Sequence, residues 1–299
     1  MWRSCLLIDV GTNPDRPRPG RTWLRDLYHV HQRLCMAFPS DARKERDPMF
    51  LAPFDPADLE CKVHGAERRA NSGFLFRIDP QPGGRVVIVV ESARQPDWDY
   101  AFGLKDGLVN DRGQPIGNAG HLLAAPPHKE PFECDYREGD RLRFRIRVNL
   151  SKKIKQHADG TDARKKKVAR MDRKGREKSQ SQRVALTWGK DKNPGEVIRL
   201  WLSKKAEPKR NDKGESLPGL GFEVESLRVL QMGWGSGFKP NHSADDGENG
   251  SRHRHLKFRS ALLEGTLRVT EAQSFKDTLA HGIGSGKAFG FGLLSVAPL

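Results

Sequence analysis

The chain has few cysteines and no long apolar segment, and each shortage excludes a class of protein. Its 299 residues include four cysteines, none of which form a CxxC pair: Cys5, Cys35, Cys61 and Cys134. Cysteines scattered in this way argue against a zinc knuckle and against a disulfide framework, and they favour a reduced, cytoplasmic compartment. No stretch approaches the roughly 20 apolar residues of a membrane-spanning helix. The short apolar run at the N-terminus reaches Asp9 too soon for a signal peptide.

The common nucleotide and metal motifs are also missing. "GSGK" at 284–287 resembles a phosphate loop, but His281 and Ala288 stand where that motif needs a glycine and a hydroxyl residue. The segment 241–255 gathers histidines and acidic residues, yet its Gly and Asn residues favour a hydrated loop over a metal site. No set of carboxylates on strand ends offers ligands for two-metal phosphoryl chemistry. We therefore expect neither a metal nor another cofactor.

The charge balance is strongly one-sided. There are 53 Lys and Arg against 38 Asp and Glu, which gives a net charge of +15. A surface this basic is typical of proteins that bind polyanions, nucleic acid first and anionic membranes second. Because no basic amphipathic helix with a wide apolar face occurs, nothing in the sequence suits a membrane surface. The sequence therefore predicts a nucleic-acid partner and no membrane partner.

Much of the positive charge lies in one segment, residues 151–183. It holds thirteen Lys and Arg against four Asp and Glu, an excess of nine (13 − 4). Its "DRKG" indicates a turn, so the segment is either a basic hairpin that follows nucleic-acid phosphates or a flexible, solvated loop. The strand predicted just before it, 141–150, alternates basic and apolar residues and so has one cationic face. The candidate RNA-binding residues of this segment are Lys152, Lys153, Lys155, Arg164, Lys165, Lys166, Lys167, Arg173 and Lys174.

The order of the predicted elements repeats once along the chain. Each half reads strand, helix, strand, strand, helix, strand, which is typical of a ferredoxin-like domain. The first half has strands at 3–10, 74–79, 85–92 and 131–136, and helices at 22–38 (capped by Thr22) and 96–103. The second has strands at 141–150, 221–234, 255–269 and the final "LLSVA", and helices at 195–205 and 270–283 (capped by Thr270). We predict an α+β protein of two tandem ferredoxin-like (RRM-like) domains, residues 1–137 and 138–299, with 11–21, 39–72 and 104–130 as loops or insertions.

The first predicted helix carries a candidate for chemistry, "LYHVHQRL". His31 lies within its apolar stripe, and Tyr28 lies beside His31 at the i, i+3 spacing. His31 is therefore either a buried core histidine or a catalytic one. A neutral imidazole next to a phenol suits RNA cleavage by the adjacent 2′-hydroxyl, because such a group moves protons near pH 7 without a metal.

Four segments resemble a known family: "RDLYHVHQRL", "FLFRID", "SARQP" and the ending "GIGSGKAFGFGLLSVAPL". Together they resemble the CasE endoribonucleases of type I-E CRISPR–Cas systems, the Cascade-associated branch of the Cas-six family. The most specific parts are the "DLY..H" pattern and the closing glycines. The resemblance implies two tandem ferredoxin-like domains that bind the repeat hairpin of precursor CRISPR RNA and cut it at the stem base without metal. It also implies that the protein stays on its product as a subunit of Cascade.

The resemblance further assigns roles to residues of this chain. It implies that His31 is the catalytic histidine, that Tyr28 is the active-site tyrosine, and that 282–292 is a glycine-rich loop. In that loop Gly284, Gly286 and Lys287 are candidates for meeting RNA phosphate, although tight packing against the neighbouring domain explains the glycines as well. Gln32 stands where some relatives have a basic residue, so the cation for the transition state must come from elsewhere, such as Lys152, Lys153 or Lys155. The alternative function is a non-catalytic RNA-binding and assembly subunit.

Overall fold

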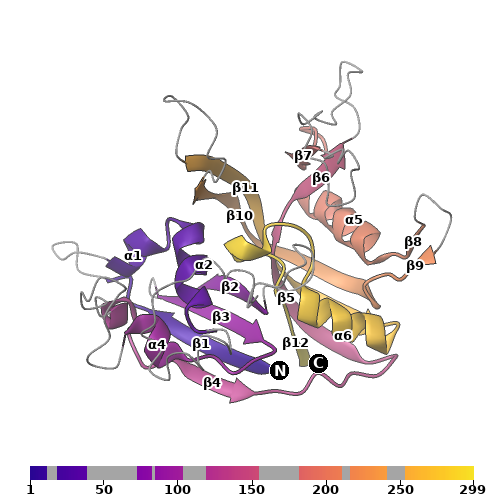
Figure 1. Ribbon diagram of the computed structural model, residues 1–299. Coiled ribbons are helices and arrows are strands. Elements are labelled where there is room, and N and C mark those ends of the chain that lie inside the picture. The colour runs from indigo at the N-terminus through magenta and orange to yellow at the C-terminus, as the bar shows by residue number, and fades with distance from the viewer. Residues whose placement is uncertain are drawn as a thin grey trace, which may run out of the picture.

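Two four-stranded antiparallel sheets frame the protein, one in each half of the chain (Figure 1). The computed structural model describes residues 1–11, 19–38, 73–82, 85–103, 119–154, 182–210, 216–240 and 253–299. Most of the predicted insertions 39–72 and 104–130 lie outside these ranges. None of the helices in the described part of the chain combines the length and the apolarity of a membrane span.

The N-terminal sheet has the strand order β2-β3-β1-β4, with antiparallel neighbours throughout. Its strands are β1 (Trp2–Ile8), β2 (Phe74–Pro80), β3 (Val86–Ser92) and β4 (His128–Pro131). The helical elements are α1 (Pro19–Trp23), α2 (Leu27–Cys35), α4 (Trp98–Phe102) and the 3-10 turn η3 (Ala119–Leu122). Val30 and Leu34 of α2 are fully buried in one core with Phe76 and Ile88 of the sheet. Burying such a side chain contributes about 1.5–3 kcal/mol, and this fixes which face of α2 packs down.

The C-terminal sheet repeats the same order as β10-β11-β5-β12. Its strands are β5 (Arg141–Asn149), β10 (Phe222–Pro240), β11 (His253–Val269) and β12 (Leu294–Pro298). The helical elements are α5 (Pro194–Ala206), α6 (Ala272–His281) and the 3-10 turn η4 (Lys287–Phe289). Short ladders pair β6 (Ser151–Ile154) with β7 (Gln182–Ala185) and β8 (Lys209–Arg210) with β9 (Ser216–Leu217). In each sheet the half's first strand lies between its third and fourth, so the predicted pair of ferredoxin-like domains is confirmed.

Two predicted helix starts are wrong. The helix expected over 22–38 is divided into α1 and α2, and Asp26 rather than Thr22 caps α2 by accepting a hydrogen bond from the Tyr28 amide (2.9 Å). The chain turns between the two helices because the Arg25 and Asp26 amides bond to carbonyls three residues back. Likewise α6 is capped by Glu271 and not by Thr270. The Glu271 carboxylate accepts hydrogen bonds from the amides of Gln273 and Ser274.

The fourth predicted strand is displaced towards the N-terminus. It was expected at 131–136, but β4 covers His128–Pro131, where it pairs with Cys5 back to Trp2 of β1. Hydrogen bonding continues one residue past Pro131, where the Phe132 amide donates to the Met1 carbonyl (2.9 Å). The other strands and helices follow the predicted order, and the predicted domain boundary at 137/138 falls between β4 and β5.

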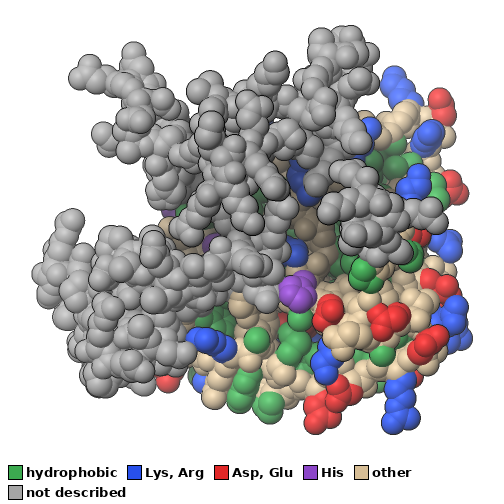
Figure 2. Space-filling model, turned by 45° about the vertical axis from the view of Figure 1, so that its right-hand side comes forward, with side chains coloured by type: hydrophobic (Ala, Val, Ile, Leu, Met, Phe, Trp, Pro, Cys, Tyr) green, Lys and Arg blue, Asp and Glu red, His purple; other side chains and the backbone are tan. Residues whose placement is uncertain are grey.

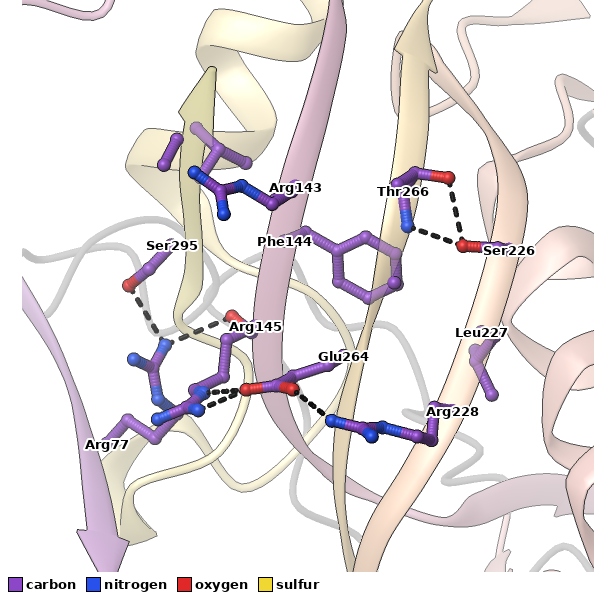
Figure 3. A pocket seen from close by; sticks show the side chains of 13 residues that line it. Arg77, Arg143, Phe144, Arg145, Ser226, Leu227, Arg228, Glu264, Thr266 and Ser295 are labelled. Atoms are coloured by element: carbon purple, nitrogen blue, oxygen red, sulfur yellow. Dashed lines mark hydrogen bonds and ion pairs between the residues drawn. The ribbon is translucent and has the colours of Figure 1, made fainter. Parts of the chain in front are cut away.

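A buried arginine joins the two sheets. Arg77 of β2 binds the Asp79 carboxylate at 2.8 Å through its Nε. Its Nη1 donates to the Arg145 carbonyl (3.0 Å), the Leu293 carbonyl (3.3 Å) and the Ser295 hydroxyl (2.9 Å) of the C-terminal domain. The contact with Ser295 is visible in Figure 3. The relative position of the domains, on which the site below depends, is thus held by hydrogen bonds that are largely shielded from water.

Candidate functional site

Helix α2 of the N-terminal domain faces the glycine-rich loop of the C-terminal domain. The Tyr28 ring centroid lies 6.2 Å from that of Phe289 in η4. A Cβ atom on Gly235 of β10 would lie 3.4 Å from Leu27 Cδ1, at van der Waals contact, so the strand passes close to the helix. The site is therefore built where α2, β10 and the loop converge.

Tyr28 and His31 lie together, as the i, i+3 spacing predicted. Their ring centroids are 6.4 Å apart, and both side chains are half-buried. The His31 imidazole stacks on Phe74 (5.6 Å) and Phe76 (6.3 Å) of β2, and its Nε2 is 3.5 Å from Cys35 Sγ. The strand thus sets the plane of the imidazole, while the helix sets its distance from Tyr28.

Burial sets the protonation of the two side chains next to His31. It raises the pKa of the Tyr28 phenol above its ordinary value, and it raises the pKa of the Cys35 thiol to about 12. Both groups are therefore neutral at physiological pH, so Tyr28 can donate a hydrogen bond but does not serve as a phenolate base. Of these three side chains, the imidazole is the one whose ordinary pKa lies near 7.

The second histidine of the motif lies outside this cluster. The His29 side chain is 65% exposed, and its Nδ1 is 3.4 Å from Asp26 Oδ2 at the start of α2. An exposed pair of this kind contributes little to stability. His29 is therefore a suitable control for His31.

The glycine-rich loop packs against both domains. It is closed at its ends by a hydrogen bond from the Ile283 amide to the Gly292 carbonyl (2.9 Å), and the Gly292 amide donates to the Arg147 carbonyl of β5 (2.8 Å). Gly290 has φ +77°, and a Cβ there would lie 2.9 Å from the Phe76 ring on which His31 stacks. Glycine is needed at this position because a side chain would meet both a left-handed backbone and an aromatic ring. Packing, one of the two explanations for the glycines, is thus observed.

The proposed phosphate-binding part of the loop is more open. Gly284 is exposed, Gly286 is partly exposed, and Lys287 lies in η4 next to Phe289. Burial lowers the pKa of the Lys287 ammonium below its ordinary value. Among the residues that the structure describes, Lys287 forms no ion pair, which leaves its charge available to an anion.

The arginine face of β5 exists as predicted, but acidic residues neutralise part of it. Arg141 binds Glu225 at 2.9 Å, while Arg145 and Arg228 both bind Glu264 (Figure 3). Figure 2 shows acidic and basic side chains intermingled over the described surface on its right-hand side. Much of this face is therefore less cationic than the sequence suggested.

The basic segment is described only at its base. β6 and β7 pair antiparallel, as a hairpin requires, and Lys152 is exposed on β6 beside Lys153. In Figure 1 these strands rise on the other side of β10 and β11 from α2, the helix that carries Tyr28 and His31. The remaining candidates lie outside the described residues: Lys155, Arg164, Lys165, Lys166, Lys167, Arg173 and Lys174.

Sequence reasoning missed four contributors to the site. Phe289 and the stacking partners of His31 come from distant segments, and their only signal was aromatic residues within the loop and in "FLFRID". Cys35 was detectable, because it lies one helical turn after His31. Within the described ranges no three His, Cys, Asp or Glu side chains form a cluster suited to a metal ion, and most of 241–255 lies outside them.

Comparisons with known proteins agree with the motifs. A family model described as "CRISPR associated protein" matches residues 1–298. The CRISPR-associated endoribonuclease Cse3 of Thermus thermophilus is 28% identical over 301 residues, covering the whole of both chains. The CRISPR system Cascade subunit CasE of Escherichia coli is 25% identical over 279 residues, covering 93% of this chain and 96% of that protein. The structure of Thermus thermophilus Cse3 bound to an RNA representing a pre-cleavage complex is similar with a TM-score of 0.53 at 25% identity, covering 99% of this chain and 98% of that one. The resemblance to CasE endoribonucleases is thereby confirmed.

Proposed function

The chain belongs to the CRISPR-associated protein family, and on that premise we propose that it is a metal-independent endoribonuclease. Its substrate is the repeat hairpin of precursor CRISPR RNA, which it cleaves at the base of the stem. It then stays on the product as a subunit of Cascade, the assembly to which the similar CasE of Escherichia coli belongs by name. We place this activity in the cytoplasm, which suits the free thiols of Cys5, Cys35 and Cys134.

One observation carries the proposal: the Tyr28–His31 pair lies against the glycine-rich loop at the junction of the domains. The imidazole supplies a group that exchanges protons near neutral pH. The neutral phenol supplies a hydrogen-bond donor, and the loop supplies exposed backbone next to the Lys287 ammonium. These are the three kinds of group that cleavage by an internal hydroxyl requires.

In the proposed reaction the 2′-oxygen attacks the adjacent phosphorus while the bond from phosphorus to the 5′-oxygen breaks. His31 takes part in proton transfer, and Tyr28 donates a hydrogen bond to the reacting groups. Lys287 and amides of the loop stabilise negative charge that develops on the phosphate oxygens. The products are a 2′,3′-cyclic phosphate and a 5′-hydroxyl, so the hydroxyl at the cut site is part of the substrate's chemistry.

Replacing His31 tests the mechanism. His31→Ala should slow cleavage of a repeat hairpin by about 100-fold or more, since general acid–base catalysis contributes on the order of 10²–10⁴, while hairpin affinity stays close to wild type. His29→Ala, on the exposed side of the same helix, should cleave at nearly the wild-type rate. Single-turnover assays measure the cleavage rate and identify the ends of the RNA products. They are run with and without EDTA, and with a 2′-deoxy substitution at the cut site. Cleavage that needs a divalent metal, or that survives loss of His31, would contradict the mechanism.

A non-catalytic RNA-binding and assembly subunit is the second candidate. It is favoured by the packing of His31 on Phe74 and Phe76, a setting that also suits a structural histidine. Wild-type protein that binds the hairpin tightly but leaves it intact over hours would establish this alternative.

A further inference from the structure

A groove of about 540 Å³ adjoins the Tyr28–His31 pair and has no role in the mechanism above. It lies between the start of α2, the loop and β10, and it is lined among others by Leu27, Arg147, Gly233, Trp234 and Phe289. Phe289 lines the groove and also lies 6.2 Å from the Tyr28 ring, so the groove begins next to the proposed cut site. Its size is within the range of sites that bind small ligands or single residues of a polymer.

The groove contains a largely buried cation, Arg147, that pairs with no carboxylate in the described part of the chain. Arg147 forms no ion pair with any described residue, in contrast to Arg141 and Arg145 on the same strand. Its Nη atoms make only long hydrogen bonds, to the Ser260 hydroxyl and the Gln231 amide oxygen (3.3 Å each), and its Nε makes none with described residues. The nearby Asp79 carboxylate is already held by Arg77. A largely buried guanidinium with unused donors is suited to a phosphate.

Gly233 lines one wall of the groove and adds no side chain to it, although packing does not require glycine at this position. A Cβ atom on Gly233 would meet nothing within 4 Å, whereas one on Gly237 would lie 2.8 Å from Phe289. Packing therefore explains Gly237 but not Gly233. A glycine inside a strand marks a bulge, a bend or a site where a ligand approaches the backbone closely, and the nearest bulge of β10 lies earlier, between Val229 and Gln231.

An aromatic side chain lies across the edge of the same groove: because neighbouring residues of a strand point to opposite faces, the Trp234 indole is on the other face of β10 from Gly233, on the side of Arg259. Trp234 is 68% exposed, and it follows Gly233 on β10, an edge strand of the sheet. The Arg259 guanidinium lies 6.0 Å from its ring on the partner strand. An exposed indole beside a cation is the usual platform on which proteins stack an unpaired base.

We propose that this groove binds the unpaired RNA strand next to the cut site, with a phosphate on Arg147 and, where the strand passes over the edge of the sheet at Gly233, a base on Trp234. The inference rests on the proposed function, because it extends that substrate beyond the hairpin stem. RNA is favoured over a protein partner because the groove holds a largely buried cation that pairs with no described carboxylate, lies next to an exposed aromatic platform, and is lined by no described carboxylate.

The test compares four RNAs that carry a 2′-deoxy cut site: the stem alone, the stem with a 5′ extension, with a 3′ extension, and with both. Wild-type protein should bind at least one extended RNA about tenfold tighter than the stem alone, which is the effect of stacking one base. Trp234→Ala should lose that gain and leave affinity for the stem unchanged, and Trp234→Phe should keep part of it. Met232→Ala, also exposed on β10 (47%) but outside the groove, should behave as wild type.

Two further variants test the proposed phosphate site at Arg147 and the need for glycine at position 233. Arg147→Gln should lower the salt dependence of binding to the extended RNA. The slope of log affinity against log salt concentration should fall by about 0.7, the value for one single-strand phosphate. Gly233→Val should fill the groove and remove the benefit of the extension, while its thermal unfolding matches wild type. A 2-aminopurine in the extension should be quenched by wild type but not by Trp234→Ala.

The inference is overturned if the extensions add no affinity, or if Trp234→Ala weakens binding of the stem alone. It is also overturned if Trp234→Ala leaves every RNA unaffected but weakens binding to other Cascade subunits, which would make the groove a protein interface. Failure of the proposed function is distinguishable, because wild-type protein would then neither bind nor cut the stem.

Discussion

At the scale of single residues, the glycine-rich loop shows how backbone geometry supports a catalytic side chain. Gly290 holds a left-handed conformation against Phe76, and Phe76 is a surface on which the His31 imidazole stacks. The loop therefore acts on the imidazole through one aromatic ring. Any side chain added at Gly290 must displace that ring or strain the backbone.

Gly290→Ala should lower the free energy of unfolding by about 1–3 kcal/mol, because a non-glycine residue at positive φ is strained and its Cβ would overlap Phe76. Urea denaturation measures this change. Gly189→Ala is the matched control, since a Cβ there meets nothing within 4 Å, and it should change stability by less than about 0.5 kcal/mol. Equal stability of the two variants would contradict the assigned role of Gly290.

At the scale of elements, α2 depends on its cap. Asp26 Oδ1 accepts a hydrogen bond from the amide of Tyr28, so the cap residue directly holds the turn that carries the proposed active-site tyrosine. The negative carboxylate also lies at the positive end of the helix dipole, where the interaction is favourable. The start of α2 is thus fixed independently of the sheet beneath it.

Asp26→Ala should cost about 1 kcal/mol, the usual effect of losing a helix cap. Thr22→Ala, at the cap position that the sequence suggested, should cost much less, because Thr22 is an exposed residue of α1. Thermal unfolding of both variants decides between the two positions. A larger loss for Thr22→Ala would contradict the assignment of the cap.

The sequence predicted the helices and strands better than the contacts between them. The alternation of basic and apolar residues in "RLRFRIRVNL" was enough to predict β5, because a strand buried on one face alternates between buried and exposed side chains. Thr22 and Asp26 are both good caps, and only the turn between α1 and α2 selects Asp26. The pairing of Arg145 and Arg228 with Glu264, and the contact of Phe289 with Tyr28, join segments far apart in the chain. No local pattern reports such contacts, so the candidate pair was predictable and its surroundings were not.

At the scale of the whole molecule, the domains are joined through a buried polar network. The Ser295 hydroxyl accepts from Arg77 and donates to the Glu91 carboxylate (3.1 Å), and the Arg3 guanidinium also binds Glu91 (3.0 Å). Burial raises the pKa of Glu91 above its ordinary value near 4.5, although Arg3 and Ser295 act in the opposite direction. The junction of the domains is therefore sensitive to proton binding.

The raised pKa of Glu91 predicts how stability depends on pH. The folded protein holds this proton more tightly than the unfolded chain, so the free energy of unfolding should fall as pH rises from about 4.5 through the raised pKa. Glu91→Gln should remove that part of the slope. Ser295→Ala removes a donor to the carboxylate, so it should extend the falling region to higher pH. Denaturation curves from pH 4 to pH 8 measure both effects, and a slope unchanged in Glu91→Gln would contradict the assignment.

The hydrogen bond between Ile283 and Gly292 has a consequence for how this protein can vary. It pins the two ends of the loop next to each other, between the end of α6 and the start of β12. Residues inserted or deleted between those ends leave the register of the final strand unchanged, and closing a slightly longer loop costs little free energy. Changes of length near the exposed Gly284 can therefore alter the reach of the loop without rebuilding the sheet, whereas Gly290 and the buried Phe291 must keep their places.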